Sequence, residues 1–217
     1  MSVSDASAVA FAARTRYDSR ARDRAATLTH PGAHVVMTTG TDRRVTVLEE
    51  ELTRVRREFE KVLDAVPTER LNVAPAGTWS PAQIVWHLAK VERGVARLIE
   101  RLDAEIGPME TVPPGPSAKK VVHVLDEFPF MDRTRRLMAP EAIRSPDVVD
   151  LVAERGRWAD GRTQLFGAIR QSGPRLSLIR HSHPFFGPFD GWQWTLMIAR
   201  HEERHLLQLH EVVAATV

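Results

Sequence analysis

The chain has 217 residues, of which 43% are hydrophobic and 27% charged, a composition typical of one water-soluble domain with a sizeable core. It contains no cysteine, which excludes disulfides, thiolate metal sites and cysteine nucleophiles, so a bound metal would need His, Asp or Glu. No stretch approaches the ~18 apolar residues of a membrane span, so we expect a cytoplasmic protein with no membrane partner.

The net charge of +2 comes from the first 40 residues, which hold five Arg and three Asp. Elsewhere basic and acidic residues alternate: Arg54, Arg56 and Arg57 stand beside Glu49–Glu51 and Glu58. Such mixing predicts solvated helix faces. Because no basic motif carries interleaved aromatic residues, we expect no nucleic-acid partner.

Residues 1–40 are predicted to be an appendage, and residues 41–217 the folded domain. The first segment is rich in Ala, Ser, Thr and Arg and has no amphipathic pattern. Its acidic residues argue against a transit peptide, and it has no apolar core of a secretory signal. It is either a disordered extension or an over-long reading frame whose natural start is Met37.

Two helices are predicted in the first half of the domain. Apolar residues at steps of three and four mark residues 43–66, which end at Pro67. The second helix, residues 81–106, begins at Ser80, whose capping box includes Gln83. The predicted buried positions are Val45, Leu48, Leu52, Val55, Phe59, Val62, Val66, Ile84, His87, Leu88, Val91, Val95, Leu98 and Leu102.

Two more helices are predicted after a connection of some 40 residues. The third, residues 147–171, stops before Gly173, and the fourth, residues 190–213, is capped by Asp190 and Gln193. The predicted core positions of the third helix are Val148, Leu151, Val152, Trp158, Leu165, Phe166 and Ile169. Prolines and a glycine predict a fixed loop over residues 181–189, and no strand pattern competes. We therefore predict an all-α four-helix bundle with a long crossover connection between the second and third helices.

Three histidines are candidates for a metal site. His201 and His205 are four residues apart, ~40° around the helix, and share one face with Gln208. His87 lies on the apolar face of the second helix. Facing helices of a bundle can bring such side chains to one ion, and three imidazoles suit zinc or nickel. The alternative is a hydrogen-bonded histidine pair and a satisfied core histidine.

Residues 201–205 also match H-E-x-x-H, the zinc metalloprotease motif. Such a protease takes its third ligand downstream, but only twelve residues follow His205, and His210 points ~140° away from it. We therefore reject a protease and expect the third ligand upstream. Glu202 points ~100° away from His201 and is predicted to be a solvated charge rather than a general base.

Several segments together resemble the DinB/YfiT-like superfamily, over roughly residues 44–213. They are Gly77–Leu88 (G-T-W-S-P-A-Q-I-V-W-H-L), Ala139–Glu141, His183–Phe189 (H-P-F-F-G-P-F) and the H-x-x-x-H-x-x-Q run from His201 to Gln208. The resemblance implies a four-helix bundle that is often a homodimer. It also implies that His87, His201 and His205 are the metal ligands.

Family members of known activity are thiol S-transferases that use bacillithiol, mycothiol or a similar low-molecular-weight thiol, or a mycothiol-dependent isomerase. The resemblance thus implies a metal-dependent thiol S-transferase or hydrolase acting on a small molecule. The alternative is a non-catalytic bundle that binds a metal or ligand and serves as an interaction module. Gln208 is either a partner that orients His205 or an ordinary polar position, and His183 is expected to be structural.

Deleting residues 1–36 should leave the fold intact, because this segment shows neither helix caps nor a face to bury. The measurement is circular-dichroism melting of a chain that starts at Met37 beside the full chain. A markedly lower melting temperature of the shorter chain would contradict the assignment of an appendage.

Overall fold

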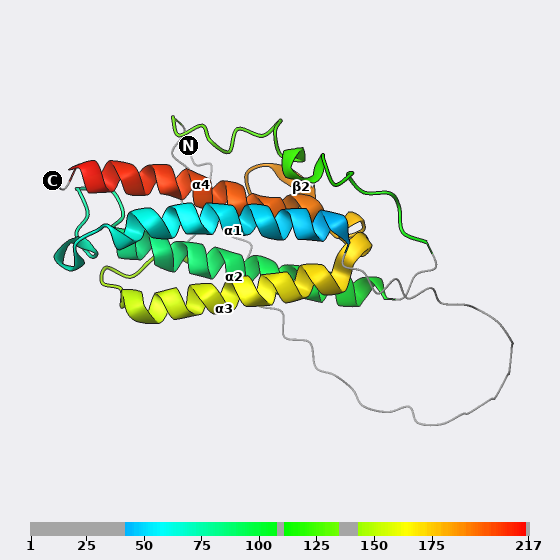
Figure 1. The fold of residues 1–217 in the computed structure, drawn as a ribbon, viewed down its shortest axis with the longest axis horizontal. Coiled ribbons are helices and arrows are strands. Elements are labelled where there is room, and N and C mark those ends of the chain that lie inside the picture. The colour runs from blue at the N-terminus through cyan, green and yellow to red at the C-terminus, as the bar shows by residue number, and fades with distance from the viewer. Residues whose placement is uncertain (1–41, 108–110, 135–142, 216–217) are drawn as a thin grey trace, which may run out of the picture. The chain divides into compact units, whose positions relative to one another are not determined.

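The computed structural model describes residues 42–107, 111–134 and 143–215, which form a bundle of four long helices with a small hairpin (Figure 1). This confirms the predicted four-helix bundle. The long helices are α1 (Arg43–Asp64), α2 (Pro81–Ile106), α3 (Leu151–Ser172) and α4 (Gly191–Ala215). The shorter elements are η1 (Thr68–Arg70), η2 (Val121–His123), η4 (Gly173–Ser177), β1 (Arg180–His183) and β2 (Gly187–Asp190).

The helices run in two parallel pairs. The first residues of α1 and α4 lie at one end of the bundle, and those of α2 and α3 at the other (Figure 1). Because α2 and α3 are parallel, the chain must return along the bundle between them, which explains the length of the connection. Its described part, residues 111–134, is held to α4: Arg200 donates to the carbonyl of Val122 (3.0 Å) and Arg204 to that of Phe130 (2.9 Å).

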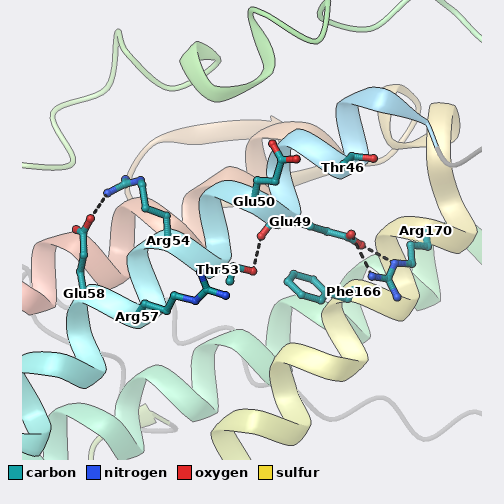
Figure 2. Close-up of a pocket in the computed structure, with 9 residues that line it drawn as sticks. All are labelled: Thr46, Glu49, Glu50, Thr53, Arg54, Arg57, Glu58, Phe166 and Arg170. Carbon is teal, nitrogen blue, oxygen red and sulfur yellow. Dashed lines mark hydrogen bonds and ion pairs between the residues drawn. The ribbon is translucent and has the colours of Figure 1, made fainter.

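Packing is uneven around the bundle. α2 packs closely on α3 and α4, and α1 on α4, whereas α1 and α3 touch little. A groove follows this open side, and Figure 2 shows the half-buried Phe166 among its charged residues. The charges pair across it or along α1, as Glu49 does with Arg170 and Arg54 with Glu58. The lining residues are Thr46, Glu49, Glu50, Thr53, Arg54, Arg57, Glu58, Phe166 and Arg170.

The predicted capping boxes fix the starts of the two helices that carry candidate ligands. At α2 the amide of Gln83 donates to Ser80 Oγ (3.2 Å), and Gln83 Oε1 accepts from the amide of Ser80 (2.9 Å). At α4 the amide of Gln193 donates to Asp190 Oδ1 (2.8 Å), and Gln193 Oε1 accepts from the amide of Asp190 (2.9 Å). Each box satisfies two backbone donors that a helix start leaves without partners.

Some expectations for the second half of the chain are wrong. The expected loop before α4 is an antiparallel hairpin in which Arg180 pairs with Asp190 and His183 with Gly187. Val148 and Val152 are 76% and 84% exposed, not core. The helix starts at Leu151, capped by Asp150, so Val148 lies outside it, and Val152 points away from the buried face. That face is Leu151, Glu154, Trp158, Arg162, Leu165 and Ile169.

The predicted appendage, residues 1–40, and the Ala139–Glu141 segment lie outside the described residues. In the part of the chain that is described, no helix combines the length and the apolar character needed to cross a bilayer.

Gly191, the first residue of α4, should not tolerate a side chain. A Cβ there would lie 2.7 Å from the carbonyl oxygen of Leu176 and 2.9 Å from its Cα, and backbone atoms cannot move aside. We expect Gly191→Ala to lower the free energy of unfolding by about 1–3 kcal/mol in urea titrations. The control is Gly156→Ala, an exposed position in α3 with open space around it. That change should stabilise by roughly 0.5–1 kcal/mol, and equal effects of both changes would contradict the account.

Candidate metal centre

The structure brings the three predicted histidines together at one point between α2 and α4. The Nε2 atom of His201 lies 3.2 Å from Nε2 of His87 and 3.1 Å from Nε2 of His205. The ligand atoms all lie within 4.8 Å of one another. Three Nε2 atoms thus face a common point to which α2 contributes one and α4 two.

Hydrogen bonds on the far side of two rings set their tautomers. Nδ1 of His87 lies 3.2 Å from the carbonyl oxygen of Ile143, and Nδ1 of His205 lies 2.8 Å from Oε1 of Gln208. Both oxygens can only accept, so each Nδ1 carries the proton and each Nε2 keeps its lone pair. Such partners also fix the orientation of metal-binding imidazoles. Gln208 therefore contacts His205. This contact is the one expected if Gln208 orients His205, the first of the two roles considered for it.

Burial keeps these rings neutral. His87 is 4% exposed and His205 9%. Burial lowers the pKa of His87 to about 4, and burial together with His87 lowers the pKa of His205 to about 3. Burial, then His205 and His87, hold the pKa of His201 well below its ordinary value. At neutral pH all three imidazoles are uncharged and offer Nε2 as a lone pair, which is the form that binds metals.

The arrangement fits a divalent ion. Zn–N distances near 2.0–2.1 Å in a tetrahedral site place ligand nitrogens roughly 3.3 Å apart. The two Nε2 separations at His201, 3.2 and 3.1 Å, come close to that value. An all-imidazole donor set suits zinc or nickel better than Mg²⁺ or Ca²⁺, which prefer oxygen. Three protein ligands leave a coordination position open, as in catalytic zinc sites.

Trp79 forms one wall of the centre. Its ring stacks on His205 with centroids 5.8 Å apart and an interplanar angle of 13°, and its centroid lies 4.7 Å from that of His87. Trp79 was not among the residues expected at the site. Its position directly before the N-cap Ser80 was the available signal, because that residue lies against the first turns of α2, where His87 is found.

The prediction for Glu202 is wrong, because its side chain is 1% exposed. The step of ~100° from His201 points it into the bundle, not toward solvent. Its Oε1 accepts from Nε of Arg56 (2.7 Å), and its Oε2 from Nη2 of Arg162 (2.8 Å). With both oxygens engaged, this carboxylate is not placed to act as the general base of an H-E-x-x-H protease.

Glu202 belongs to a closed group of four charges that we term the charged quartet: Arg56, Glu92, Arg162 and Glu202. Each long helix contributes one member. Arg56 Nη2 donates to Glu92 Oε2 (2.6 Å), and Arg162 Nε donates to Glu92 Oε1. Burial opposes the charge of Arg162, but the carboxylates of Glu92 and Glu202 outweigh it and raise the pKa of Arg162. The quartet is neutral as a whole, so no net charge is buried.

His183 lies in the hairpin and packs among aromatic rings. Its ring stacks on Phe186 at 4.9 Å and on Phe189 at 5.1 Å between centroids. Its Nδ1 accepts from the amide of Phe185 (3.2 Å), and burial lowers its pKa to about 4. This packing agrees with the structural role expected for His183.

Acid should destabilise the metal-free protein through these histidines. Their folded pKa values lie below the unfolded value of ~6.5, so their contribution is complete above that pH and is lost as the pH falls toward about 4. For His87 the full loss is on the order of 3 kcal/mol. Urea titrations with chelator at about pH 7.5 and about pH 5 measure it. His87→Gln should weaken the pH dependence, and an unchanged dependence in that variant would contradict the prediction.

Comparison with known proteins shows the family to which this chain belongs. A family model described as the DinB superfamily matches residues 51–209, a range that includes all three histidines. The crystal structure of TT2238, a four-helix bundle protein, matches with a TM-score of 0.49 and 19% identity, over 77% of this chain and 98% of that one. No curated protein matches. Because the family model spans well over half of the sequence, this chain belongs to the DinB superfamily.

Proposed function

We propose that this protein is a metal-dependent enzyme in which His87, His201 and His205 hold one zinc or nickel ion. We propose further that it transfers a low-molecular-weight thiol, of the bacillithiol or mycothiol kind, to a small electrophile. The observation that carries the proposal is the convergence of three Nε2 atoms while two of the rings direct Nδ1 to fixed acceptors. We also propose that the protein is a homodimer in the cytoplasm.

A divalent ion in such a site lowers the pKa of a bound thiol or water and so supplies a nucleophile near neutral pH. The chain's own residues would prepare the site for it. The carbonyl of Ile143 and the amide of Gln208 orient two of the imidazoles. Trp79 covers the face of His205 and restricts water on that side. His201 is half-buried, whereas His87 and His205 are buried.

A hydrolase is the nearest variant of this function, with water in place of the thiol. A non-catalytic bundle that binds a metal or ligand is the second candidate. The observation that favours it is the burial of His87 and His205, which narrows access to the centre. The two classes differ in whether the site serves a reaction or the fold, and this difference can be measured.

His205→Ala should remove both the metal and the activity while leaving a folded bundle, because α1 and α2 carry continuous apolar stripes of their own. Elemental analysis of protein purified without a His-tag should find about one zinc or nickel ion per unaltered chain. A screen that conjugates several low-molecular-weight thiols to small electrophiles, with an ester-hydrolysis assay beside it, measures activity.

Melting with and without chelator, followed by circular dichroism, separates the two classes. A metal-free protein that stays helical and cooperative but inactive supports the enzyme. A metal-free protein that unfolds, with no activity in the metal-loaded form, supports the scaffold, since a metal that binds only the native state adds to its stability. Stoichiometric metal in a His87→Ala, His201→Ala, His205→Ala variant would contradict the site itself.

A further inference from the structure

The charged quartet ties the two helices that bear histidines to the two that bear none. On α4, Glu202 lies between His201 and His205, and on α2, Glu92 follows His87 by five residues. Both carboxylates bind the same two arginines, one on α1 and one on α3. The two arginines therefore link the positions of α2 and α4 relative to each other. Glu92 and Glu202, the carboxylates that they bind, lie less than two helical turns from the histidines.

The arginines are themselves held in place. The guanidinium of Arg56 stacks on the ring of Trp158, with its central carbon 3.4 Å from the ring centroid. Arg162 Nη1 donates to the backbone carbonyl of Leu52 at 2.6 Å. These contacts cross between α1 and α3, two helices that otherwise touch little. The charged quartet is thus held in place by contacts with residues outside it.

Stability alone is a weak reason for these four charges. A buried ion network must recover the free energy lost when its members leave water, and apolar residues of similar size often stabilise a core as well or better. Apolar core residues lie within about one turn of quartet members on the same helices: Leu52, Val55, Val95 and Leu165. What charged, hydrogen-bonded groups add over apolar ones is a unique geometry, because each donor must meet its acceptor.

Burial does not set the rotation of α4 in the first half of the helix. Its first half is buried on all sides, since Trp192 and every residue from Trp194 to Ala199 is buried. A helix that is apolar all round has no preferred face to turn toward a core. Glu202 is the buried charge on this helix, and its two oxygens must face Arg56 and Arg162. With Glu202 so placed, His201 and His205 are directed to the side where His87 lies.

We propose that the charged quartet positions the metal ligands: it sets the rotation of α4 and its register on α2 so that the three Nε2 atoms meet. The proposal rests on the proposed metal site. The four side chains are positioning residues, because they touch neither the metal nor a substrate. They set the positions of the three imidazoles through the backbone of α4 and α2.

The test replaces the whole quartet by apolar residues, in the variant Arg56→Met, Glu92→Leu, Arg162→Met, Glu202→Leu. Co²⁺ serves as the probe, because its visible spectrum reports the coordination geometry and its titration gives an affinity. We expect a folded variant with a melting temperature equal to or above that of the unaltered metal-free protein. We also expect Co²⁺ affinity at least about 10-fold weaker, the effect that loss of supporting contacts has at other metal sites, and an altered spectrum.

The matched control is Arg54→Gln with Glu203→Gln. This pair also joins α1 to α4, and Glu203 also lies between the two ligands, but the pair lies at the surface. Its loss should leave Co²⁺ affinity within about 2-fold, since exposed pairs contribute little. An equal loss in the control would overturn the proposal by showing that any charge change between the ligands has the same effect.

A folded apolar variant that binds Co²⁺ as tightly as the unaltered protein, with the same spectrum, would overturn the proposal and leave the metal site standing. If that variant does not fold, Arg162→Lys decides the matter, because it keeps the charge but loses the fork that reaches both glutamates and Leu52. Weaker Co²⁺ binding by this variant supports the proposal, and unchanged binding overturns it. No Co²⁺ binding by the unaltered protein would overturn the proposed function as well.

Discussion

Four buried charges have to be satisfied together at the centre of this bundle, one from each long helix. Removing one member of such a group leaves a net charge uncompensated inside the bundle, at about 3–5 kcal/mol, a large part of the stability of a domain. The helices can therefore pack only in arrangements in which Arg56 and Arg162 both reach Glu92 and Glu202. Apolar contacts supply most of the driving force for packing, and the quartet restricts which packing is allowed.

Local signals predicted much of the fold. Capping boxes at Ser80 and Asp190 mark helix starts with few alternatives, because a backbone amide and a side chain must reciprocate at a fixed spacing. The apolar residues of α1 and α2 recur at the fixed period of a helix, so they predicted the buried faces of both helices. The stripe of α3 was misjudged, since two of its buried positions are Glu154 and Arg162, charges that a search for apolar residues passes over.

Which histidines meet at the candidate centre was predictable, but the surroundings of the centre were not. His201 and His205 share a helix, so spacing alone places them on one face. His87 was a candidate as a histidine on the apolar face of the second helix, and the family resemblance supported it. Ile143, whose carbonyl orients His87, is 56 positions away along a connection with no regular pattern. The partners of Glu202 are equally distant, on α1 and α3, and no local pattern distinguishes a solvated glutamate from one that meets two arginines inside a bundle.

The position of Glu202 also bears on which nucleophile suits the proposed site. Hydrolysis at a metal centre is assisted further when a nearby base takes the proton of the bound water, whose free pKa is ~15.7, whereas a cysteine-like thiol starts from ~8.5. The two carboxylates between the ligands, Glu202 and Glu203, are both ion-paired, one inside the bundle and one with Arg54 and Arg200. A thiol needs the smaller change in acidity and no such base. The engagement of these carboxylates therefore favours thiol transfer over hydrolysis as the reaction to test first.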